Sequence, residues 1–520
     1  MTEPTILRMK PYIQPFERLL AVQELESLIG TDSAMLRPEH DYAIRGEAAL
    51  EAARSLAYWE AIGEEYTPQV RREAASVIAR NGVALSELPF LQPSQIDAKA
   101  PRSRCLRYGP HGIHEYRGKF FPQLVKALIN ISGVRDGTVL DPMCGSGTTL
   151  VEAAAAGHRA VGFDMNPLSV FVSRTKCCSL HLTPSRVVGA YEVLVRRVES
   201  GVEPSPPAPR GSEDDLYLRQ WFSQRVLAEL DLLVATIDGL PDREVAQLFK
   251  VSLSNIVRRV SFQKEEDLRI RREYKKVDPD RVRALFLEEA LRSAKAVVAD
   301  LAHGLGARIG EARVAEGDAR SFVRDGGVEA ESIDLVVTSP PYATALPYLD
   351  TDRLSLSFLG LLSRPDHRGR DREMIGNREI TDLARRRQWE RYTAERAVLP
   401  ASVTALIDRI ERENGEGKVG FRRRNLGALL ATYFFDMRSV LLEIQKTLRP
   451  GGQAFLVVGN NRTKTPAGEI EIRTSELLLA MAEAAGFADC RRVPMEMLHS
   501  RDIFRENRTP SEHILSMRRQ

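Results

Sequence analysis

The chain is 520 residues long, and its 74 Lys and Arg residues against 71 Asp and Glu residues give a formal net charge of +3. This length holds one large α/β domain with additions, or two to three domains. A hydrophobic content of 43% and a charged content of 28% are typical of globular proteins, and they exclude a membrane-spanning chain because no apolar run is long enough. The start also lacks a signal-peptide pattern, so we expect a cytoplasmic protein with no membrane association.

The five cysteines and nine histidines give no sign of a disulfide framework or a metal site. The number of cysteines is odd, Cys-x-x-Cys is missing, and the histidines lack the spacing of metal ligands. We therefore expect reduced thiols and no bound metal.

The first hundred residues show helical periodicity over 46–63 and 69–81 and contain no chemical motif. We expect residues 1–100 to form a helical N-terminal extension that packs on the main domain; a separate DNA-reading module is the alternative. The stretch 102–131 then reads as a basic loop that leads into an amphipathic helix over 123–131.

The residues Thr138–Gly147 read Thr-Val-Leu-Asp-Pro-Met-Cys-Gly-Ser-Gly, and a helix-like run follows them to Ala156. A short apolar strand ends at Asp141, two glycines allow a tight turn against a ligand, and Thr148 or Thr149 is suited to cap the helix. Such a unit places backbone N–H groups and a carboxylate at the edge of the sheet where nucleotide-like cofactors bind. The loop lacks the Gly-Lys-Ser/Thr ending of triphosphate-binding loops. It also lacks the three-glycine spacing of dinucleotide-binding loops.

A second strand is predicted over 160–163, and it ends at Asp164. An acidic residue about twenty residues beyond the glycines is where an α/β cofactor site needs a carboxylate to accept both ribose hydroxyls. The same residue type would also serve as the N-cap of the next helix, and the two roles are compatible.

Residues 176–306 are predicted to form a helical insertion, with runs over 184–199, 214–237, 242–261 and 279–303. Its segment 258–276 mixes Lys and Arg with acids, which fits a solvated helical face or a phosphate-facing surface. A third strand over 312–315 follows, and it leads to Asp318 in a turn-forming sequence.

The residues Ser332–Tyr342 read Ser-Ile-Asp-Leu-Val-Val-Thr-Ser-Pro-Pro-Tyr. The β-branched apolar run predicts a buried parallel strand, and the Pro-Pro pair ends it because proline cannot donate a ladder hydrogen bond.

The segment 363–424 is dense in arginine and contains Trp389, Tyr392 and Phe421. We expect a basic, loop-rich insertion that contacts DNA phosphates; a merely exposed surface is the alternative. The sheet is then completed by helices over 429–448 and 475–485 and strands over 453–458, 491–494 and 512–517.

The glycine loop and the Pro-Pro motif together resemble the S-adenosylmethionine-dependent DNA amino-methyltransferases. The loop resembles their Asp-Pro-Phe-x-Gly-Ser-Gly-Thr-Thr signature, with Met143 and Cys144 in the variable places. The second motif resembles their Asp/Asn/Ser-Pro-Pro-Tyr/Phe/Trp tetrapeptide, whose Ser form after Thr is most typical of cytosine-N4 enzymes. The resemblance implies an α/β fold, a Rossmann-like methyltransferase sandwich in unpermuted strand order over 101–520. The insertions 176–306 and 363–424 match no motif, and the second is our candidate for target recognition.

The resemblance also implies S-adenosyl-L-methionine as cofactor. An element of His-x-Tyr-x-x-Lys-Phe-x-Pro type covers the methionine end of that cofactor in the family, and it is matched by His114, Tyr116, Lys119, Phe120 and Pro122. An acid after the third strand accepts from the adenine amino group, a role that falls to Asp318. The expected cofactor-binding residues are Lys119, Phe120, Pro122, Asp141, Pro142, Cys144, Gly145, Ser146, Gly147, Asp164, Asn166, Asp318 and Ala319.

The expected catalytic residues are Ser339, Pro340, Pro341 and Tyr342. The hydroxyl of Ser339 and the carbonyl of Pro340 would accept the two N–H bonds of an exocyclic amine, and Tyr342 would stack on the flipped base. The predicted function is site-specific methylation of cytosine N4 in double-stranded DNA, within a restriction-modification system if a cognate endonuclease exists. Adenine N6 is the nearest alternative, followed by an RNA base and by an inactive DNA-binding subunit. Carbon-5 methylation needs a Pro-Cys nucleophile, and the sequence has no such dipeptide.

Overall fold

The computed structural model describes residues 3–30, 34–36, 41–116, 120–200, 210–264, 271–274, 277–306, 308–343, 348–378, 380–415, 419–495 and 512–520.

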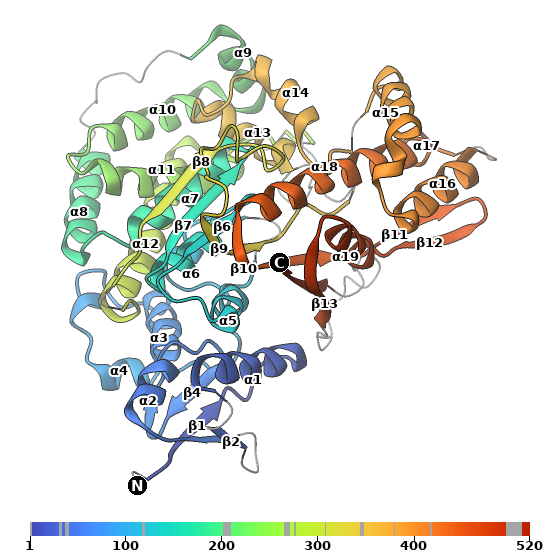
Figure 1. Ribbon diagram of the computed structural model, residues 1–520. Coiled ribbons are helices and arrows are strands. Elements are labelled where there is room, and N and C mark those ends of the chain that lie inside the picture. The colour runs from blue at the N-terminus through green and yellow to red at the C-terminus, as the bar shows by residue number, and fades with distance from the viewer. Residues whose placement is uncertain are drawn as a thin grey trace.

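A seven-stranded sheet with the order β13-β14-β10-β9-β6-β7-β8 lies at the centre of the main domain (Figure 1). Its strands are β6 (Thr138–Asp141), β7 (Arg159–Asp164), β8 (Ala312–Glu316), β9 (Ile333–Thr338), β10 (Leu448–Gly459), β13 (Phe487–Met495) and β14 (Glu512–Arg519). Neighbours from β8 to β10 are parallel, whereas β14 runs antiparallel to both β10 and β13. From the β8 edge, the strands follow as third, second, first, fourth, fifth, seventh and sixth. The predicted α/β sandwich with unpermuted strand order is therefore confirmed.

The central strand β9 is buried on both faces. Ile333 and Val336 pack into one hydrophobic core with α18 (Leu426–Thr447) and α19 (Thr474–Ala484). Leu335 and Val337 point the other way, toward α5 (Pro122–Ser132), α6 (Thr148–Ala155) and α7 (Pro167–Ser179). From Leu335 to Val337 successive side chains alternate between the two cores, so both faces of the strand are apolar there, as expected for a parallel strand between two helical layers.

The N-terminal hundred residues contain a second sheet beside their helices, which the prediction of a helical extension did not include. Five antiparallel strands in the order β2-β3-β1-β4-β5 accompany four helices. The elements are β1 (Thr5–Met9), α1 (Pro15–Ile29), β2 (Ala34–Leu36), β3 (Tyr42–Ile44), α2 (Glu47–Ala53), β4 (Trp59–Ile62), β5 (Glu65–Tyr66), α3 (Pro68–Arg80) and α4 (Pro93–Asp97). The strands β2 to β5 have two to four residues each, so their pairing with distant segments leaves no readable local period. The helix expected over 69–81 is present as α3.

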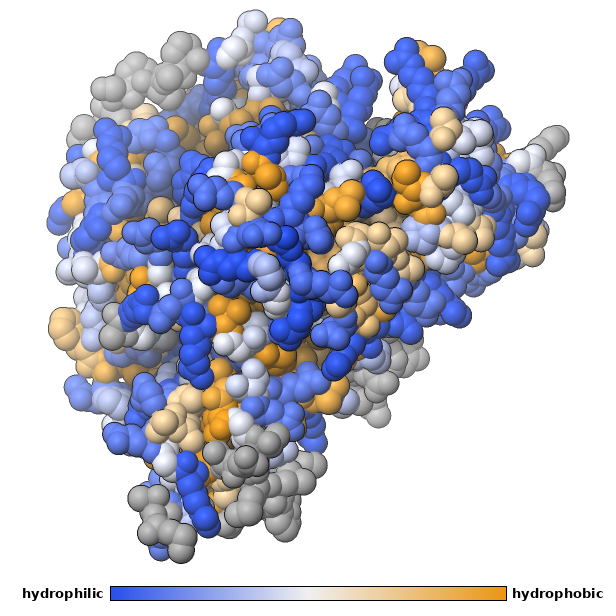
Figure 2. Space-filling view, in the orientation of Figure 1, coloured by the Kyte–Doolittle hydropathy of each residue, from blue (hydrophilic) through white to orange (hydrophobic). Residues whose placement is uncertain are grey.

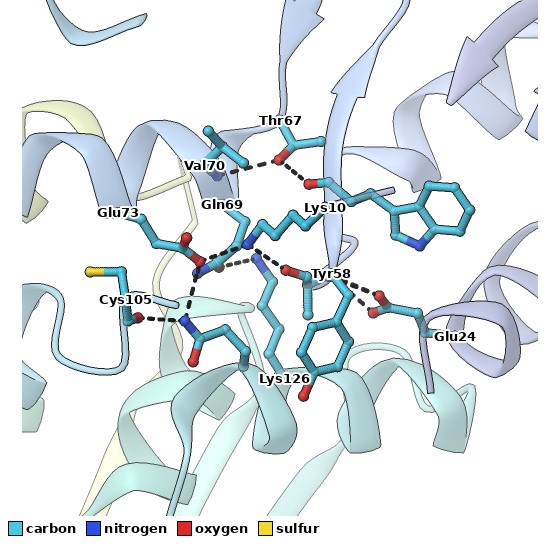
Figure 3. A network of polar contacts seen from close by, with 12 residues as sticks. Lys10, Glu24, Tyr58, Thr67, Gln69, Val70, Glu73, Cys105 and Lys126 are labelled. Atoms are coloured by element: carbon cyan, nitrogen blue, oxygen red, sulfur yellow. Dashed lines mark hydrogen bonds and ion pairs between the residues drawn. The ribbon is translucent and has the colours of Figure 1, made fainter. Parts of the chain in front are cut away.

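A buried polar network joins this N-terminal part to α5 (Figure 3). Lys10 Nζ forms an ion pair of 2.7 Å with Glu73 Oε1, and both side chains are almost completely buried. Gln123 Nε2 donates to the same carboxylate at 3.2 Å, and Lys126 Nζ donates to Gln69 Oε1 at 2.9 Å. These contacts dock the N-terminal sheet and α3 against the main domain.

The described residues of the segment 176–306 are mostly helical. It contains α8 (Pro184–Ser200), α9 (Ser212–Trp221), α10 (Gln224–Asp238), α11 (Arg243–Val257) and α12 (Pro279–His303). The single helix expected over 214–237 is divided, because Phe222 is extended and the hydroxyl of Ser223 caps α10 by accepting from the N–H of Val226.

The arginine-dense segment is mostly helical, which corrects the expectation of a loop-rich insertion. After α13 (Tyr348–Phe358) it forms α14 (Arg364–Glu373), α15 (Asp382–Glu395), α16 (Ala401–Gly415) and α17 (Phe421–Arg424). The last three lie near the hairpin of β11 (Asn461–Thr465) and β12 (Gly468–Ile472), at the right of Figure 1. Hydrophilic residues dominate the visible face of this projection (Figure 2). The short 3-10 helices are Leu88–Phe90, Gly109–Gly112 and Arg396–Val398. Within the ranges described above, no helix combines the length and apolar character needed to cross a bilayer.

Candidate active site

A cavity lies at the carboxyl ends of β6, β7 and β9. Its walls come from the glycine loop, the end of β7, the Pro-Pro motif and residues before α5. The lining residues are Tyr116, Phe120, Phe121, Leu124, Asp141, Pro142, Met143, Cys144, Gly145, Ser146, Thr148, Asp164, Met165, Asn166, Gly317, Ala319, Ser339, Pro340, Pro341, Tyr342, Met374, Ile375, Val457 and Glu512. The two motifs, nearly two hundred residues apart in the chain, therefore open into one space.

The glycine loop requires glycine at two positions for different reasons. Gly145 has a φ of 49° and packs against Tyr116, so an added Cβ would lie 3.2 Å from that ring. Gly147 has a φ of 78°, and an added Cβ would lie 2.8 Å from the Cβ of Ser173. The hydroxyl of Ser173 donates to the carbonyl of Gly145 at 2.7 Å, which fixes the loop on α7.

The prediction that Thr148 or Thr149 caps the following helix was wrong. The cap residue of α6 is Gly147, which has no side chain to accept from the N–H groups of the first turn. Thr148 and Thr149 are already helical, whereas a cap residue needs a non-helical backbone. The hydroxyl of Thr149 instead donates to the carbonyl of Val337 at 3.1 Å, which ties the helix to β9.

Asp141 ends β6 and joins the two motifs. Its Oδ1 accepts a hydrogen bond of 2.6 Å from the Thr338 hydroxyl and one of 3.2 Å from the N–H of Met143. The side chain is 2% exposed, and this burial raises its pKa to about 6 despite the donors around it.

Asp164 ends β7 and faces the glycine loop. Its Oδ2 accepts from the N–H of Gly145 and its Oδ1 from the N–H of Asn166, both at 2.8 Å. Burial raises the pKa of this carboxyl to about 6. The N-cap of α7 is Asn166, which accepts from the N–H of Leu168 at 3.0 Å, so Asp164 does not cap the helix.

Several expected cofactor residues lie outside this cavity. Gly317 and Ala319 line it, but the carboxylate of Asp318 is held by Arg320 at 2.7 Å and is not part of the wall. Pro122 is the first residue of α5 and Gly147 is the last glycine of the loop. Neither residue is part of the cavity wall. Lys119 lies outside the described residues.

Cys144 is buried and chemically quiet. Its Sγ lies 3.9 Å from the hydroxyl of Ser173, and burial raises the pKa of the thiol well above its ordinary value. A protonated, enclosed thiol is a poor nucleophile, which agrees with its expected role as part of the loop.

The Pro-Pro motif follows β9 directly. The hydroxyl of Ser339 donates to the carbonyl of Val457 on β10 at 3.1 Å, and the hydroxyl of Tyr342 donates to the carboxylate of Glu512 on β14. A Cβ at Gly376 would lie 3.2 Å from the carbonyl oxygen of Tyr342, so residues after α14 pack closely on the motif.

Sequence reasoning missed part of the wall. The missed residues include Phe121, Leu124, Met165, Gly317, Met374, Ile375, Val457 and Glu512. Met374 and Ile375 belong to the arginine-dense insertion, which is anchored here because Arg370 donates to the carbonyl of Met165 at 2.7 Å and Arg320 to that of Glu373 at 2.8 Å. Val457 could have been found as the end of an apolar strand, whereas Glu512 carries no local signal.

Comparisons with known proteins agree with a methyltransferase site. Residues 114–190 match the UPF0020 family, described as an RMKL-like methyltransferase domain. The type II methyltransferase M.MvaI of Kocuria varians is 21% identical over 411 residues, which cover 75% of this chain and 86% of the relative. M.BsoBI of Geobacillus stearothermophilus, also a type II methyltransferase, is 22% identical over 422 residues, with 72% and 78% covered.

A shorter match and two solved structures complete the comparison. The tRNA (guanine(10)-N2)-dimethyltransferase of Methanothermobacter thermautotrophicus is 44% identical over 52 residues, 10% of this chain and 16% of the relative. TrmN from Thermus thermophilus is 11% identical with a TM-score of 0.32, covering 99% of this chain and all of that one. The rRNA methyltransferase aviRa from Streptomyces viridochromogenes is 11% identical with a TM-score of 0.26, covering 78% and 88%.

Proposed function

We propose that this chain is an S-adenosylmethionine-dependent DNA methyltransferase that methylates the exocyclic N4 of cytosine at a specific sequence in double-stranded DNA. The observation that carries the proposal is the opening of Ser339, Pro340 and Tyr342 into the same cavity as the glycine loop. The long matches to type II methyltransferases support DNA as the substrate.

S-adenosylmethionine is the cofactor, and the residues of the cavity fit it. Each oxygen of Asp164 accepts one backbone N–H and retains a lone pair for a ribose hydroxyl. The tight glycine turn admits a ligand close to the backbone, and Tyr116, Phe120 and Leu124 supply apolar wall. When bound, the cofactor supplies an electrophilic methyl group.

The Pro-Pro motif would orient the target amine. An exocyclic amine is a weak nucleophile because its lone pair is delocalised into the ring. The Ser339 hydroxyl donates its hydrogen bond to the Val457 carbonyl. Its oxygen therefore still has lone pairs that can accept an N–H of the base. With the Pro340 carbonyl as second acceptor, the amine would become more pyramidal and its lone pair would point at the methyl group.

The base has to leave the duplex to reach this cavity, and Tyr342 would then stack on it. We assign target recognition to the insertion 363–424, although ion pairs occupy part of its arginines. Arg385 pairs with Glu411, Arg396 with Asp408, and Arg391 with Glu395. Exposed arginines suited to phosphate contacts include Arg386, Arg387, Arg422, Arg423 and Arg424.

The test is transfer of labelled methyl from S-adenosylmethionine to unmethylated genomic DNA, followed by nucleoside mass spectrometry. N4-methylcytosine that disappears in the Ser339→Ala variant supports the proposal, with Ser332→Ala, a half-buried serine at the other end of β9, as the matched control. Detection of N6-methyladenine instead would identify adenine as the target base. The proposed roles of the Pro-Pro motif would stay the same. An RNA base is the second candidate because of the short tRNA dimethyltransferase match, so total RNA is assayed in parallel. A cognate endonuclease and a cytoplasmic location stay predictions.

A further inference from the structure

The hydroxyl of Tyr342 donates to Oε1 of Glu512, and both residues line the cavity beside Ser339. Glu512 belongs to no motif and stands 170 residues away in the chain. Resting on the proposed function, we infer that Glu512 is a positioning residue, which holds the Tyr342 ring in the orientation that receives the target base.

The sheet brings Glu512 to this place. Glu512 is the first residue of β14, and its Cα is paired with Gly459 of β10 and with Met495 of β13. Gly459 lies two residues beyond Val457, whose carbonyl accepts the proton of Ser339. The strand β10 therefore positions two hydrogen-bond acceptors. It carries the Val457 carbonyl that accepts from Ser339, and its pairing with β14 places the Glu512 carboxylate that accepts from Tyr342.

The hydrogen bond to Glu512 restrains the far end of the Tyr342 ring, in addition to the contacts at its backbone. On the backbone side, Pro341 precedes Tyr342 and the chain at Gly376 packs against the Tyr342 carbonyl. Rotation about the two side-chain torsions would still turn the ring, and a hydrogen bond from the phenol to a carboxylate opposes that rotation. A ring that is ordered before the base arrives costs less conformational entropy on binding, so more of the stacking energy is retained.

A purely structural role for Glu512 predicts different results. Anchoring the end of β14 would affect folding and cofactor binding, and it would not depend on the hydroxyl of Tyr342. Positioning affects the methyl-transfer step and depends on that hydroxyl, so a double-mutant cycle separates the two roles.

The experiment measures kcat and KM for methyl transfer in the wild type and in Glu512→Ala, Glu512→Gln, Tyr342→Phe and the Glu512→Ala/Tyr342→Phe double variant. Glu469→Ala, which removes an exposed carboxylate on β12, is the matched control. Cofactor affinity is measured by calorimetry for each protein. We expect kcat/KM of Glu512→Ala to fall about tenfold or more with unchanged cofactor affinity, and Glu512→Gln to stay within about threefold because its amide oxygen still accepts. In the Tyr342→Phe background, Glu512→Ala should cost less than about twofold.

Equal losses from Glu512→Ala in both backgrounds would overturn the inference, as would a wild-type kcat/KM in Glu512→Ala. Failure of the proposed function looks different, because the wild type would then transfer no methyl to DNA. Transfer to total RNA alone would refute the DNA proposal, and the same cycle would be run on RNA. A wild type inactive on both substrates would overturn both conclusions.

Discussion

The hydroxyl of Thr338 donates to Oδ1 of Asp141 across 2.6 Å, which ties the end of β9 to the end of β6. One strand end carries the Pro-Pro motif and the other carries the glycine loop. This hydrogen bond adds to the backbone pairing of the two strands and helps to fix the glycine-loop side of the cavity relative to the Pro-Pro side. It is fully buried, so its geometry is not relaxed by water.

Replacement of Thr338 by Val should therefore damage both stability and catalysis. Loss of a buried donor leaves Asp141 with one fewer partner, and we expect the free energy of unfolding to fall by about 1 to 3 kcal/mol. Thr338→Ser keeps the hydroxyl and should retain more methyl-transfer activity than Thr338→Val. Urea unfolding and initial rates measure the two effects, and identical rates for the Ser and Val variants would contradict the role of the bond.

Cofactor binding should weaken as the pH falls through about 6. Burial raises the pKa of Asp164 to about 6, so the carboxylate that would accept the ribose hydroxyls becomes protonated near neutral pH. We expect the Kd for S-adenosylmethionine to rise about tenfold from pH 7 to pH 5, in step with the ionised fraction. Calorimetry across this range measures it, and Asp164→Asn should bind weakly with a flat profile. A pH step that persists in Asp164→Asn would assign the titration to another group.

The same pKa values predict the opposite trend for the folded state without cofactor. Because the folded-state pKa values of Asp141 and Asp164 lie above the unfolded values near 4, their contribution to stability is complete below that pH. This contribution to the free energy of unfolding is lost as the pH rises through about 6, the folded-state pKa of both groups. The Asp164→Asn variant should therefore lose less stability than the wild type between pH 5 and pH 7, as measured by urea unfolding.

The sequence predicted the fold and the motifs because these signals are local. A strand, a glycine turn and the helix after it occupy consecutive residues, and so does the strand that ends at Pro340 and Pro341. Their proximity follows from the parallel sheet, since neighbouring parallel strands end at the same edge.

The features that the sequence did not predict depend on pairing between distant strands or on ion pairs between distant residues. The strands β2 to β5 are too short to show a period, and Glu512 reaches the cavity only through the register between β10 and β14. Asp318 fits its expected role by position, but Arg320 takes its carboxylate. Arginine density likewise does not measure exposed charge, because Arg385 and Arg396 pair with acids a helix away.

The buried pair Lys10 and Glu73 should contribute strongly to the attachment of the N-terminal sheet (Figure 3). Lys10→Met removes the cation and leaves a buried carboxylate with only amide donors from Gln69 and Gln123. We expect the free energy of unfolding to fall by about 3 to 5 kcal/mol, and the Lys10→Met/Glu73→Gln double variant to lose less than the sum of the single changes. Urea unfolding measures these losses.

An exposed ion pair provides the control for this experiment. Arg54 and Glu51 lie 3.3 Å apart on the surface, and Arg54→Met should cost less than about 1 kcal/mol. A loss in Lys10→Met no larger than in Arg54→Met would mean that the network of Figure 3 adds little to the docking of the N-terminal part.

The exposed arginines of α17 should contribute to DNA affinity without setting the reaction. Arg422, Arg423 and Arg424 follow one another in α17, just before α18, in the segment that also supplies Met374 and Ile375 to the cavity. Arginines that bind phosphates release counterions, so their replacement by Ala should weaken binding and reduce the slope of log K against log salt by about 1 for each phosphate that is no longer neutralised. Arg271→Ala/Arg272→Ala in the helical insertion is the comparison. Fluorescence anisotropy at several salt concentrations measures the slopes. A reduced slope only in the second variant would transfer DNA binding from the 363–424 insertion to the 176–306 insertion.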